Sequence, residues 1–211
     1  MIYWIKTNWI IKRIFSRYIW DIPNNANKVY LTFDDGPTPD ITEWTLIQLN
    51  QYNAKATFFC IGDNVQKHPE IFKKILENGH AFGNHTFDQL NGWKTNTSDF
   101  IRNIAQCDNV GAPIAPNHAM LFRPPYGKIK KSQASKLLEL GYRIVMWDVL
   151  SADFDTSMSA EKCLTNVLKN IKSGSIIVFH DSIKASKNLQ YALPKTLAFL
   201  KEKGYECDVI S

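Results

Sequence analysis

The sequence predicts a single α/β domain built on a mainly parallel sheet, either open or closed into a barrel. Short apolar runs alternate with longer helical patterns from Val29 onward, which is typical of repeated strand-helix units. The 211 residues suit one full hydrophobic core and are too few for two ordinary domains. Four glycines sit just past a predicted helix and before a predicted strand, where a left-handed C-cap is favoured: Gly79, Gly141, Gly174 and Gly204.

The predicted elements alternate regularly along the chain. Each short apolar run is assigned to a strand, and each longer run with apolar residues at helical spacing to a helix. The strands are expected near residues 29–33, 56–60, 80–83, 120–123, 142–147, 174–180 and 205–210. The helices are expected at residues 40–52, 63–78, 97–110, 131–140, 159–172 and 189–203.

The first twenty residues combine apolar and basic side chains at amphipathic helical spacing. We therefore divide the chain into an N-terminal amphipathic helix with its lead-in, residues 1–27, and a domain of residues 28–211. The helix would lie either in a membrane interface or against the domain, and its pattern favours neither. The residues concerned are Ile2, Tyr3, Trp4, Ile5, Trp9, Ile10, Ile11, Ile14, Phe15, Tyr18, Ile19 and Trp20, with Lys6, Lys12, Arg13 and Arg17.

This N-terminal stretch has neither the uninterrupted apolar core and small-residue cleavage site of a secretory signal nor the length of a membrane span. We expect a location in the cytoplasm or on the inner membrane face, with peripheral membrane contact through residues 1–20. The net charge is +5, but the lysines are scattered, so no nucleic-acid partner is expected. The alternative is that nucleic acid binds through the basic N-terminal helix. We expect a monomer.

The four cysteines are widely spaced, without a Cys-x-x-Cys pair, which argues against a disulfide framework. Cys60 ends the apolar run Thr57-Phe58-Phe59 and is expected to be a small buried hydrophobic residue.

Ionisable side chains follow five of the predicted strands at the point where each strand ends. The carboxyl ends of parallel strands share one rim, so these side chains are expected to face one site. Adjacent acids on a strand point to opposite faces, but the turn at Gly36-Pro37 lets both converge. The strand-end residues are Asp34 and Asp35, His85, Arg123, Asp148 with Asp153, and His180 with Asp181.

These residue types suit metal-assisted hydrolysis. A carboxylate and a histidine begin a divalent metal site, and a second, unligated carboxylate can act as a base toward water. His180 would protonate a leaving group, and Arg123 would hold the base carboxylate ionised by a charge-assisted hydrogen bond.

The residues at these strand ends resemble those of the polysaccharide deacetylases of carbohydrate esterase family 4, which share the NodB homology domain. The resemblance extends from Lys28 to the C-terminus. Five stretches follow the order of the family's motifs: 32–37, 85–89, 122–127, 147–153 and 177–180. The resemblance implies an irregular (β/α) barrel with seven or eight mainly parallel strands. It also implies that Asp34 is the catalytic base and Asp35 a metal ligand.

The second motif departs from the family's pattern of two histidines four residues apart. His85 is present as the first ligand, but Gln89 replaces the second histidine. Residues four apart on a helical turn share a face, so Gln89 would still reach the metal through its carbonyl oxygen, with Asp88 as a substitute. The implied cofactor is a divalent metal, first zinc and then cobalt or nickel. Loss of one ligand is expected to leave the site empty at low metal concentration.

The remaining motifs are intact in residue type. Arg123 would orient Asp34, and the Tyr126 backbone N–H would help to hold an oxyanion in a groove wall that includes Pro125. Asp153 would support the catalytic acid His180. Val178 would line the acetyl pocket, with apolar side chains of the 147–153 stretch near it. Trp93 and Trp147 would either stack on sugar rings or simply pack.

The implied function is hydrolytic removal of acetyl groups from N-acetylated, or alternatively O-acetylated, sugars of a glycan, with activity weakened by Gln89. The alternative is a deacetylase-like protein that binds carbohydrate without efficient turnover. The presence of Asp34, Asp35, Arg123 and His180 favours the enzyme, since a decayed site would have less reason to keep them all.

Overall fold

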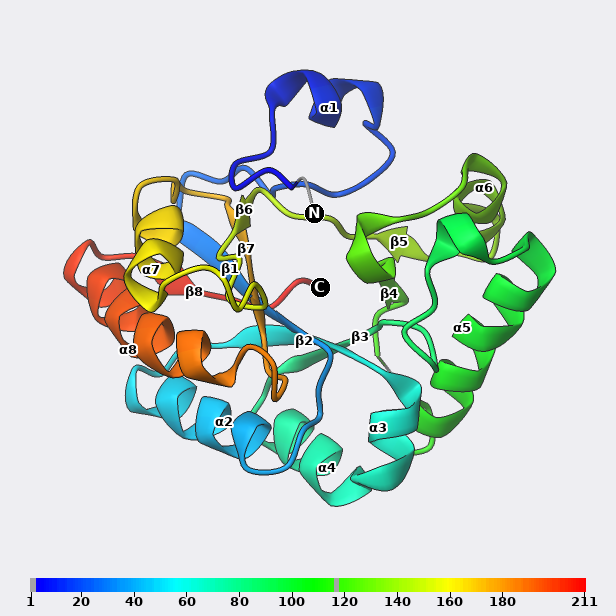
Figure 1. Ribbon diagram of the computed structural model, residues 1–211, viewed down its shortest axis with the longest axis horizontal. Helices are drawn as coiled ribbons and strands as arrows, with labels where there is room; N and C mark the ends of the chain where they lie inside the picture. The colour runs from blue at the N-terminus through cyan, green and yellow to red at the C-terminus, as the bar shows by residue number, and fades with distance from the viewer. Residues whose placement is uncertain (1–2, 116–117) are drawn as a thin grey trace.

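The computed structural model describes residues 3–115 and 118–211 and has one curled, parallel sheet at its centre (Figure 1). Its strand order is β5-β4-β3-β2-β1-β7-β6, with β8 paired to β1, and every strand pair is parallel. This arrangement confirms the irregular barrel expected from the sequence. The strands are β1 (Lys28–Asp34), β2 (Ala56–Cys60), β3 (Ala81–Asn84), β4 (Leu121–Phe122), β5 (Arg143–Ile144), β6 (Val149–Leu150), β7 (Ile176–His180) and β8 (Glu206–Cys207).

Helices cover the outside of the curled sheet, as Figure 1 shows. Short polar side chains start several of them: Asn96 accepts a hydrogen bond from the Asp99 N–H at the start of α5, and Ser159 accepts one from the Lys162 N–H at the start of α7. The helices are α1 (Trp9–Ile14), α2 (Ile41–Gln51), α3 (Gly62–Lys67), α4 (Pro69–Glu77), α5 (Thr97–Gly111), α6 (Lys131–Glu139), α7 (Ala160–Leu168) and α8 (Ser186–Glu202).

Strand β1 is the centre of the hydrophobic core. All of its residues from Val29 to Asp34 are buried, as expected for a parallel strand covered on both faces. Phe33 stacks between Phe58 of β2 and Phe179 of β7, at centroid distances of 5.0 and 6.1 Å. The rigid packing of three neighbouring strands fixes where β1 ends and where its terminal carboxylates lie.

The N-terminal segment reaches both edge strands of the sheet. Ile19 bridges to Val145, just after β5, while Lys6 bridges to Val149 of β6. The backbone bonds are direct: the Ile19 N–H donates to the Ile144 oxygen, and the Leu150 N–H donates to the Ile5 oxygen. The segment therefore occupies edge groups that would otherwise be open to pairing with other chains.

Some element boundaries differ from the sequence-based expectation. The helix expected at 63–78 is two helices, because Pro69 disfavours helical geometry at His68 and starts a new helix. The strand expected at 142–147 ends at Ile144, and a separate strand, β6, follows. The helix expected within residues 1–20 covers only Trp9–Ile14. Residues 1–2 of that expectation lie outside the described residues.

Within residues 3–115 and 118–211, no helix is long and apolar enough to cross a bilayer. The cysteines of these residues are free, and Cys60 is buried as expected.

Candidate active site

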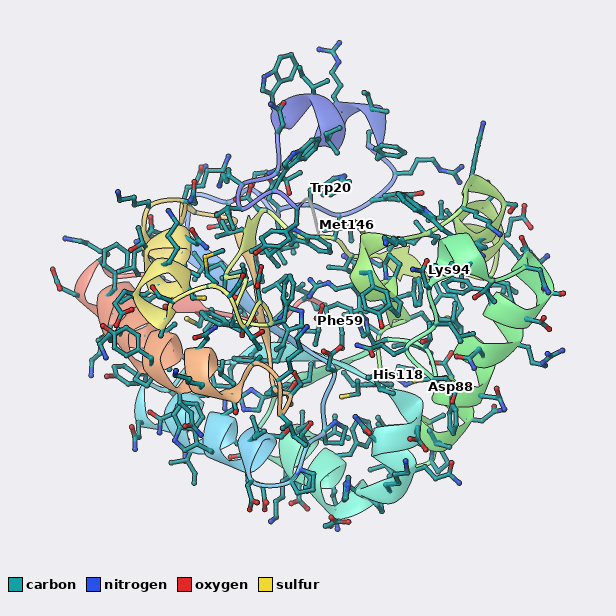
Figure 2. All side chains as sticks on the ribbon, viewed as in Figure 1. Trp20, Phe59, Asp88, Lys94, His118 and Met146 are labelled. Atoms are coloured by element: carbon teal, nitrogen blue, oxygen red, sulfur yellow. The ribbon has the colours of Figure 1, made fainter. Side chains whose placement is uncertain are left out.

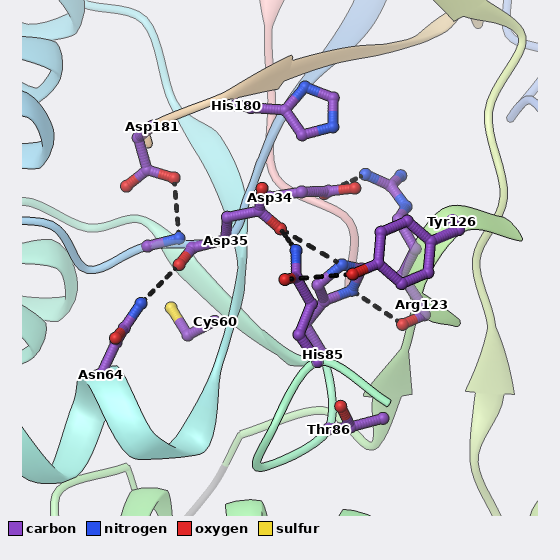
Figure 3. Close-up of polar contacts among 12 residues, drawn as sticks. Asp34, Asp35, Cys60, Asn64, His85, Thr86, Arg123, Tyr126, His180 and Asp181 are labelled. Atoms are coloured by element: carbon purple, nitrogen blue, oxygen red, sulfur yellow. Dashed lines mark hydrogen bonds and ion pairs between the residues drawn. The ribbon is translucent and has the colours of Figure 1, made fainter. Parts of the chain in front are cut away.

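The site begins where β1 ends in Asp34 and Asp35 (Figure 3). Asp35 has left the strand with a φ of 82°, and the turn lets the two carboxylates face a common space. Asp181 holds the turn from behind, accepting hydrogen bonds from the Gly36 N–H at 3.1 Å and from the Thr42 hydroxyl. A Cβ on Gly36 would lie only 2.0 Å from Asp181 Oδ2, so this close approach requires glycine.

Asp34 is paired with the fully buried guanidinium of Arg123, whose Nη1 lies 2.7 Å from Asp34 Oδ1. The guanidinium also donates to the Thr32 hydroxyl and to the carbonyl oxygens of Val145 and Met146. Its Cζ lies 4.1 Å from the centre of the Phe59 ring. These contacts fix the guanidinium, so Asp34 has a charged partner of defined direction.

His180 is paired with the buried carboxylate of Asp153. His180 Nδ1 lies 2.8 Å from Asp153 Oδ1, and the His180 backbone N–H donates to Oδ2 at 2.9 Å. Burial alone would lower the pKa of His180, but the charge and hydrogen bond of Asp153 raise it to about 9. The imidazole is therefore protonated at neutral pH.

His85 and Asp35 present two electron-pair donors to each other. His85 Nδ1 lies 2.8 Å from the Arg123 carbonyl oxygen, which can only accept, so Nδ1 carries the proton. Burial lowers the pKa of His85, which keeps the ring neutral and leaves a lone pair on Nε2. That Nε2 lies 3.6 Å from Asp35 Oδ1. A cation between the two atoms would satisfy both.

The geometry of the 85–89 stretch differs from the expected helical turn. Thr86 and Gln89 have positive φ values of 65° and 54°, and the stretch is irregular. Gln89 presents its amide nitrogen, not its carbonyl oxygen, to Asp35, with Nε2 2.6 Å from Oδ1. The Asp88 carboxylate, the expected substitute, accepts a hydrogen bond from Asn103 of α5, and Figure 2 shows Asp88 beside that helix.

The residues expected to contact substrate differ widely in exposure. Tyr126 is half exposed and sits at a φ of 61° in the turn Pro125–Gly127, while Pro125 is buried. Trp147 is partly buried and lies so close to Gly127 that a Cβ there would be 2.7 Å from its ring. Val178 is almost fully buried in β7. Trp93 is 61% exposed, so its ring is open to solvent, not packed in the core.

Two of the strand-end acids, Asp181 and Asp148, have structural roles that the sequence pattern did not distinguish from catalytic ones. Asp181, next to His180, supports the Gly36 turn, and burial raises its pKa to about 8. Asp148 is not in the site, although it follows an expected strand. Its buried carboxylate binds Lys6 and Lys12 of the N-terminal segment. The two lysines at positions 6 and 12 were the only available signal for this second pairing.

A curled parallel sheet with a carboxylate-arginine pair, a carboxylate-histidine pair and an aspartate-histidine pair on one rim defines a hydrolase of the (β/α) barrel class. The family model described as polysaccharide deacetylase matches residues 21–145, more than half of the chain. The chain belongs to the polysaccharide deacetylase family.

Two known relatives match this chain over most of their own length. A peptidoglycan-N-acetylglucosamine deacetylase of Bacillus cereus is 37% identical over 194 residues, which are 91% of this chain and 90% of that protein. A chitooligosaccharide deacetylase of Azorhizobium caulinodans is 33% identical over 161 residues, 76% of each chain. A crystal structure of a peptidoglycan N-acetylglucosamine deacetylase is similar with a TM-score of 0.88 and 34% identity, covering 94% of both chains.

One further similar structure is a mutant of a carbohydrate esterase family 4 pseudoenzyme with restored enzymatic activity. It is 26% identical, with a TM-score of 0.80, and the match covers 91% of this chain and 69% of that one.

The divalent metal that this family generally uses is accommodated by only part of the site. Among the described residues, 3–115 and 118–211, no cluster of three histidine, cysteine or acidic side chains converges on one point. Asp35 Oδ1 and His85 Nε2 are suitably disposed, because two ligands about 2.1 Å from one ion at a tetrahedral angle lie about 3.4 Å apart. Gln89, with its N–H directed at Asp35, does not fit as a ligand in this orientation.

Proposed function

We propose that the protein hydrolyses the acetamide group of N-acetylated sugars in a glycan, releasing acetate and a free amino sugar. One observation carries this proposal: Asp34 and His180 occupy paired positions on the adjacent strands β1 and β7. The first is ion-paired with Arg123, and Asp153 keeps the second protonated. A carboxylate that can accept a proton and a protonated histidine that can donate one are thus neighbours, which is the pair that amide hydrolysis requires.

In the proposed reaction Asp34 removes a proton from the water that attacks the acetamide carbon. The backbone N–H of Tyr126 binds the carbonyl oxygen as it gains negative charge. His180 then donates its proton to the sugar nitrogen as the carbon-nitrogen bond breaks. Asp153 holds the His180 ring in position through Nδ1, which directs the other ring nitrogen toward the leaving group.

A divalent ion held by Asp35 and His85 would polarise the carbonyl and lower the pKa of the attacking water. We propose zinc, with cobalt and nickel as alternatives, because an imidazole and a carboxylate suit all three ions. The substrate class follows the relatives, whose names specify peptidoglycan N-acetylglucosamine and chitooligosaccharides. Exposed Trp93 and Tyr126 are suited to contact sugar rings.

The test is an assay of acetate release from N-acetylglucosamine oligomers, with zinc, cobalt or nickel added to protein purified without chelators. An O-acetylated glycan assayed in parallel separates amide from ester hydrolysis. Release of acetate together with an equal amount of free amine supports the proposal. Retained oligomer binding without acetate at saturating metal would instead identify a carbohydrate-binding protein without turnover.

We also propose that α1 contacts an anionic membrane surface. The helix has no buried residue, and its neighbourhood exposes apolar and basic side chains together. Trp9 is 67% exposed and Ile14 64%, and the basic Arg13 and Arg17 are exposed among them. Aromatic and aliphatic residues flanked by arginines are the composition that binds the interface of a negatively charged bilayer.

A further inference from the structure

The structure assigns to Gln89 a role opposed to that of a metal ligand. Its side-chain amide donates to Asp35 Oδ1, the oxygen that would face a metal ion. We propose that this amide must move away before a divalent ion binds. The inference concerns the same site as the proposed function and rests on it only for the pair Asp35 and His85. Its test measures metal binding, not turnover, so failure of one proposal is distinguishable from failure of the other.

The first argument is the polarity of the contact at Asp35. Gln89 Nε2 donates to Asp35 Oδ1 at 2.6 Å, which places a partial positive charge against the carboxylate. The same Oδ1 faces the lone pair of His85 Nε2 at 3.6 Å. Asp35 Oδ1 and His85 Nε2 are both acceptors and have no positive charge between them. The amide hydrogen of Gln89 supplies a partial positive charge at Asp35 Oδ1.

The second argument is that both ends of the amide are engaged. The Tyr126 hydroxyl donates to Gln89 Oε1 at 3.3 Å, on the side away from Asp35. Turning the amide over would place Oε1 against the carboxylate oxygen, acceptor against acceptor. A carboxamide at this position is thus held with its nitrogen inward, whereas the ring nitrogen of a histidine can offer a lone pair.

Metal binding would consequently break the bond between Gln89 and Asp35. A hydrogen bond to a charged, partly buried carboxylate corresponds to about a ten- to hundredfold change in an equilibrium constant. Removing the amide should therefore tighten metal binding by about tenfold, although it removes a potential oxygen ligand. A true ligand would behave in the opposite way.

The experiment is calorimetric titration of the full-length, metal-free protein with Zn²⁺, repeated with Co²⁺ by absorption. The variants are Gln89→Ala and Gln89→His, and the matched control is Gln51→Ala, an exposed glutamine at the end of α2. We expect Gln89→Ala to bind about tenfold more tightly than the natural protein, Gln89→His more tightly still, and Gln51→Ala to match the natural protein.

Thermal unfolding of the metal-free proteins gives a second readout and shows that each variant folds. Gln89→Ala should unfold at a lower temperature without metal, because Asp35 loses its donor, and should gain more from added Zn²⁺ than the natural protein. Weaker or unchanged Zn²⁺ binding by folded Gln89→Ala would overturn the proposal, with weaker binding identifying Gln89 as a ligand.

Discussion

At the scale of single residues, the site is built from charged side chains that each have one defined polar partner. Arg123 fixes Asp34, Asp153 fixes His180, and Gln89 caps Asp35. For His180 the partner also decides the protonation state, so exchanging Asp153 should alter the chemistry before it alters the fold.

The pair of His180 and Asp153 predicts a pH dependence. The pKa of His180 is raised to about 9, so the acid form is present below that pH and is lost as the pH rises through it. In Asp153→Asn the raising charge is gone and burial dominates, so the alkaline limb of kcat should move down by at least about one pH unit. The measurement is kcat against pH at equal metal occupancy for both proteins.

The same pair also contributes to stability, with the opposite sign from a carboxylate of lowered pKa. A histidine whose folded pKa is raised stabilises the fold fully below its unfolded pKa of about 6.5 and loses this effect as the pH rises through about 9.

For the kinetic prediction, an alkaline limb of kcat that stays in place in folded Asp153→Asn would show that another group is the acid.

The sequence was sufficient to name the residue types of the site, but not the direction of each side chain. Each of the five residues either ends a strand or directly follows one, and parallel topology brings the strand ends together: Asp34, Asp35, His85, Arg123 and His180. The inward nitrogen of Gln89 was not predictable, since both ends of an amide are compatible with the sequence and only the neighbouring Asp35 and Tyr126 select one.

At the scale of elements, the N-terminal segment is attached to the sheet by a buried ion cluster. Asp148 is fully buried and binds Lys6 and Lys12, and it accepts a hydrogen bond from Ser175 at 2.6 Å. Burial would raise the pKa of Asp148, but the bonds from the two lysines and the serine outweigh it and lower the pKa. The carboxylate is therefore charged and stabilising at neutral pH.

Asp148→Asn should lower the free energy of unfolding by about 2 kcal/mol, because the partly buried Lys6 loses its counter-ion and Lys12 keeps only Asp21. Since the folded pKa is lowered, the natural protein should lose this contribution as the pH falls through it, and the difference between the proteins should shrink in acid. Urea unfolding at several pH values measures both effects. In the control, Asp63→Asn removes the partner of Lys67, an exposed pair, and should change little. Equal stability of Asp148→Asn and the natural protein would contradict the account.

The exposed face of α1 predicts binding to anionic vesicles. The protein should sediment with phosphatidylglycerol vesicles and much less with phosphatidylcholine vesicles, and added salt should weaken the binding. The double variant Trp9→Ser, Ile14→Ser should reduce binding about tenfold or more, because two large apolar side chains no longer enter the interface. Ile47→Ser, an exposed isoleucine on α2, is the matched control. Equal binding by all three proteins would remove the proposal.

Alternation of apolar runs located most helices and strands, because each buried strand is a short apolar block. Strand β6 was missed, since its two residues pair with β7 and the N-terminal segment only after the chain has folded. The break within the helix expected at 63–78 was also missed, because it depends on the single residue Pro69 in an otherwise helical pattern.

At the scale of the whole molecule, the curled sheet explains why distant motifs form one site. Strand β1 is central, with β2 on one side and β7 on the other, so the stretches that follow β1 and β7 are neighbours although they are far apart in sequence (Figure 1). The N-terminal segment contacts both edge strands of the sheet. The sequence pattern did not decide whether this segment packs on the domain or lies on a membrane. The structure has a packed connection on each side of α1 and an exposed helix between them.

The central claim is that Asp34 and His180 act together as base and acid on an N-acetylated glycan. Its most direct test is single-turnover acetate release from an N-acetylglucosamine oligomer by the natural protein and by Asp34→Asn, both loaded to equal zinc occupancy. We predict acetate release by the natural protein and a rate at least about a hundredfold lower for Asp34→Asn with unchanged oligomer binding. Equal rates, or no acetate from the zinc-loaded natural protein, would contradict the account.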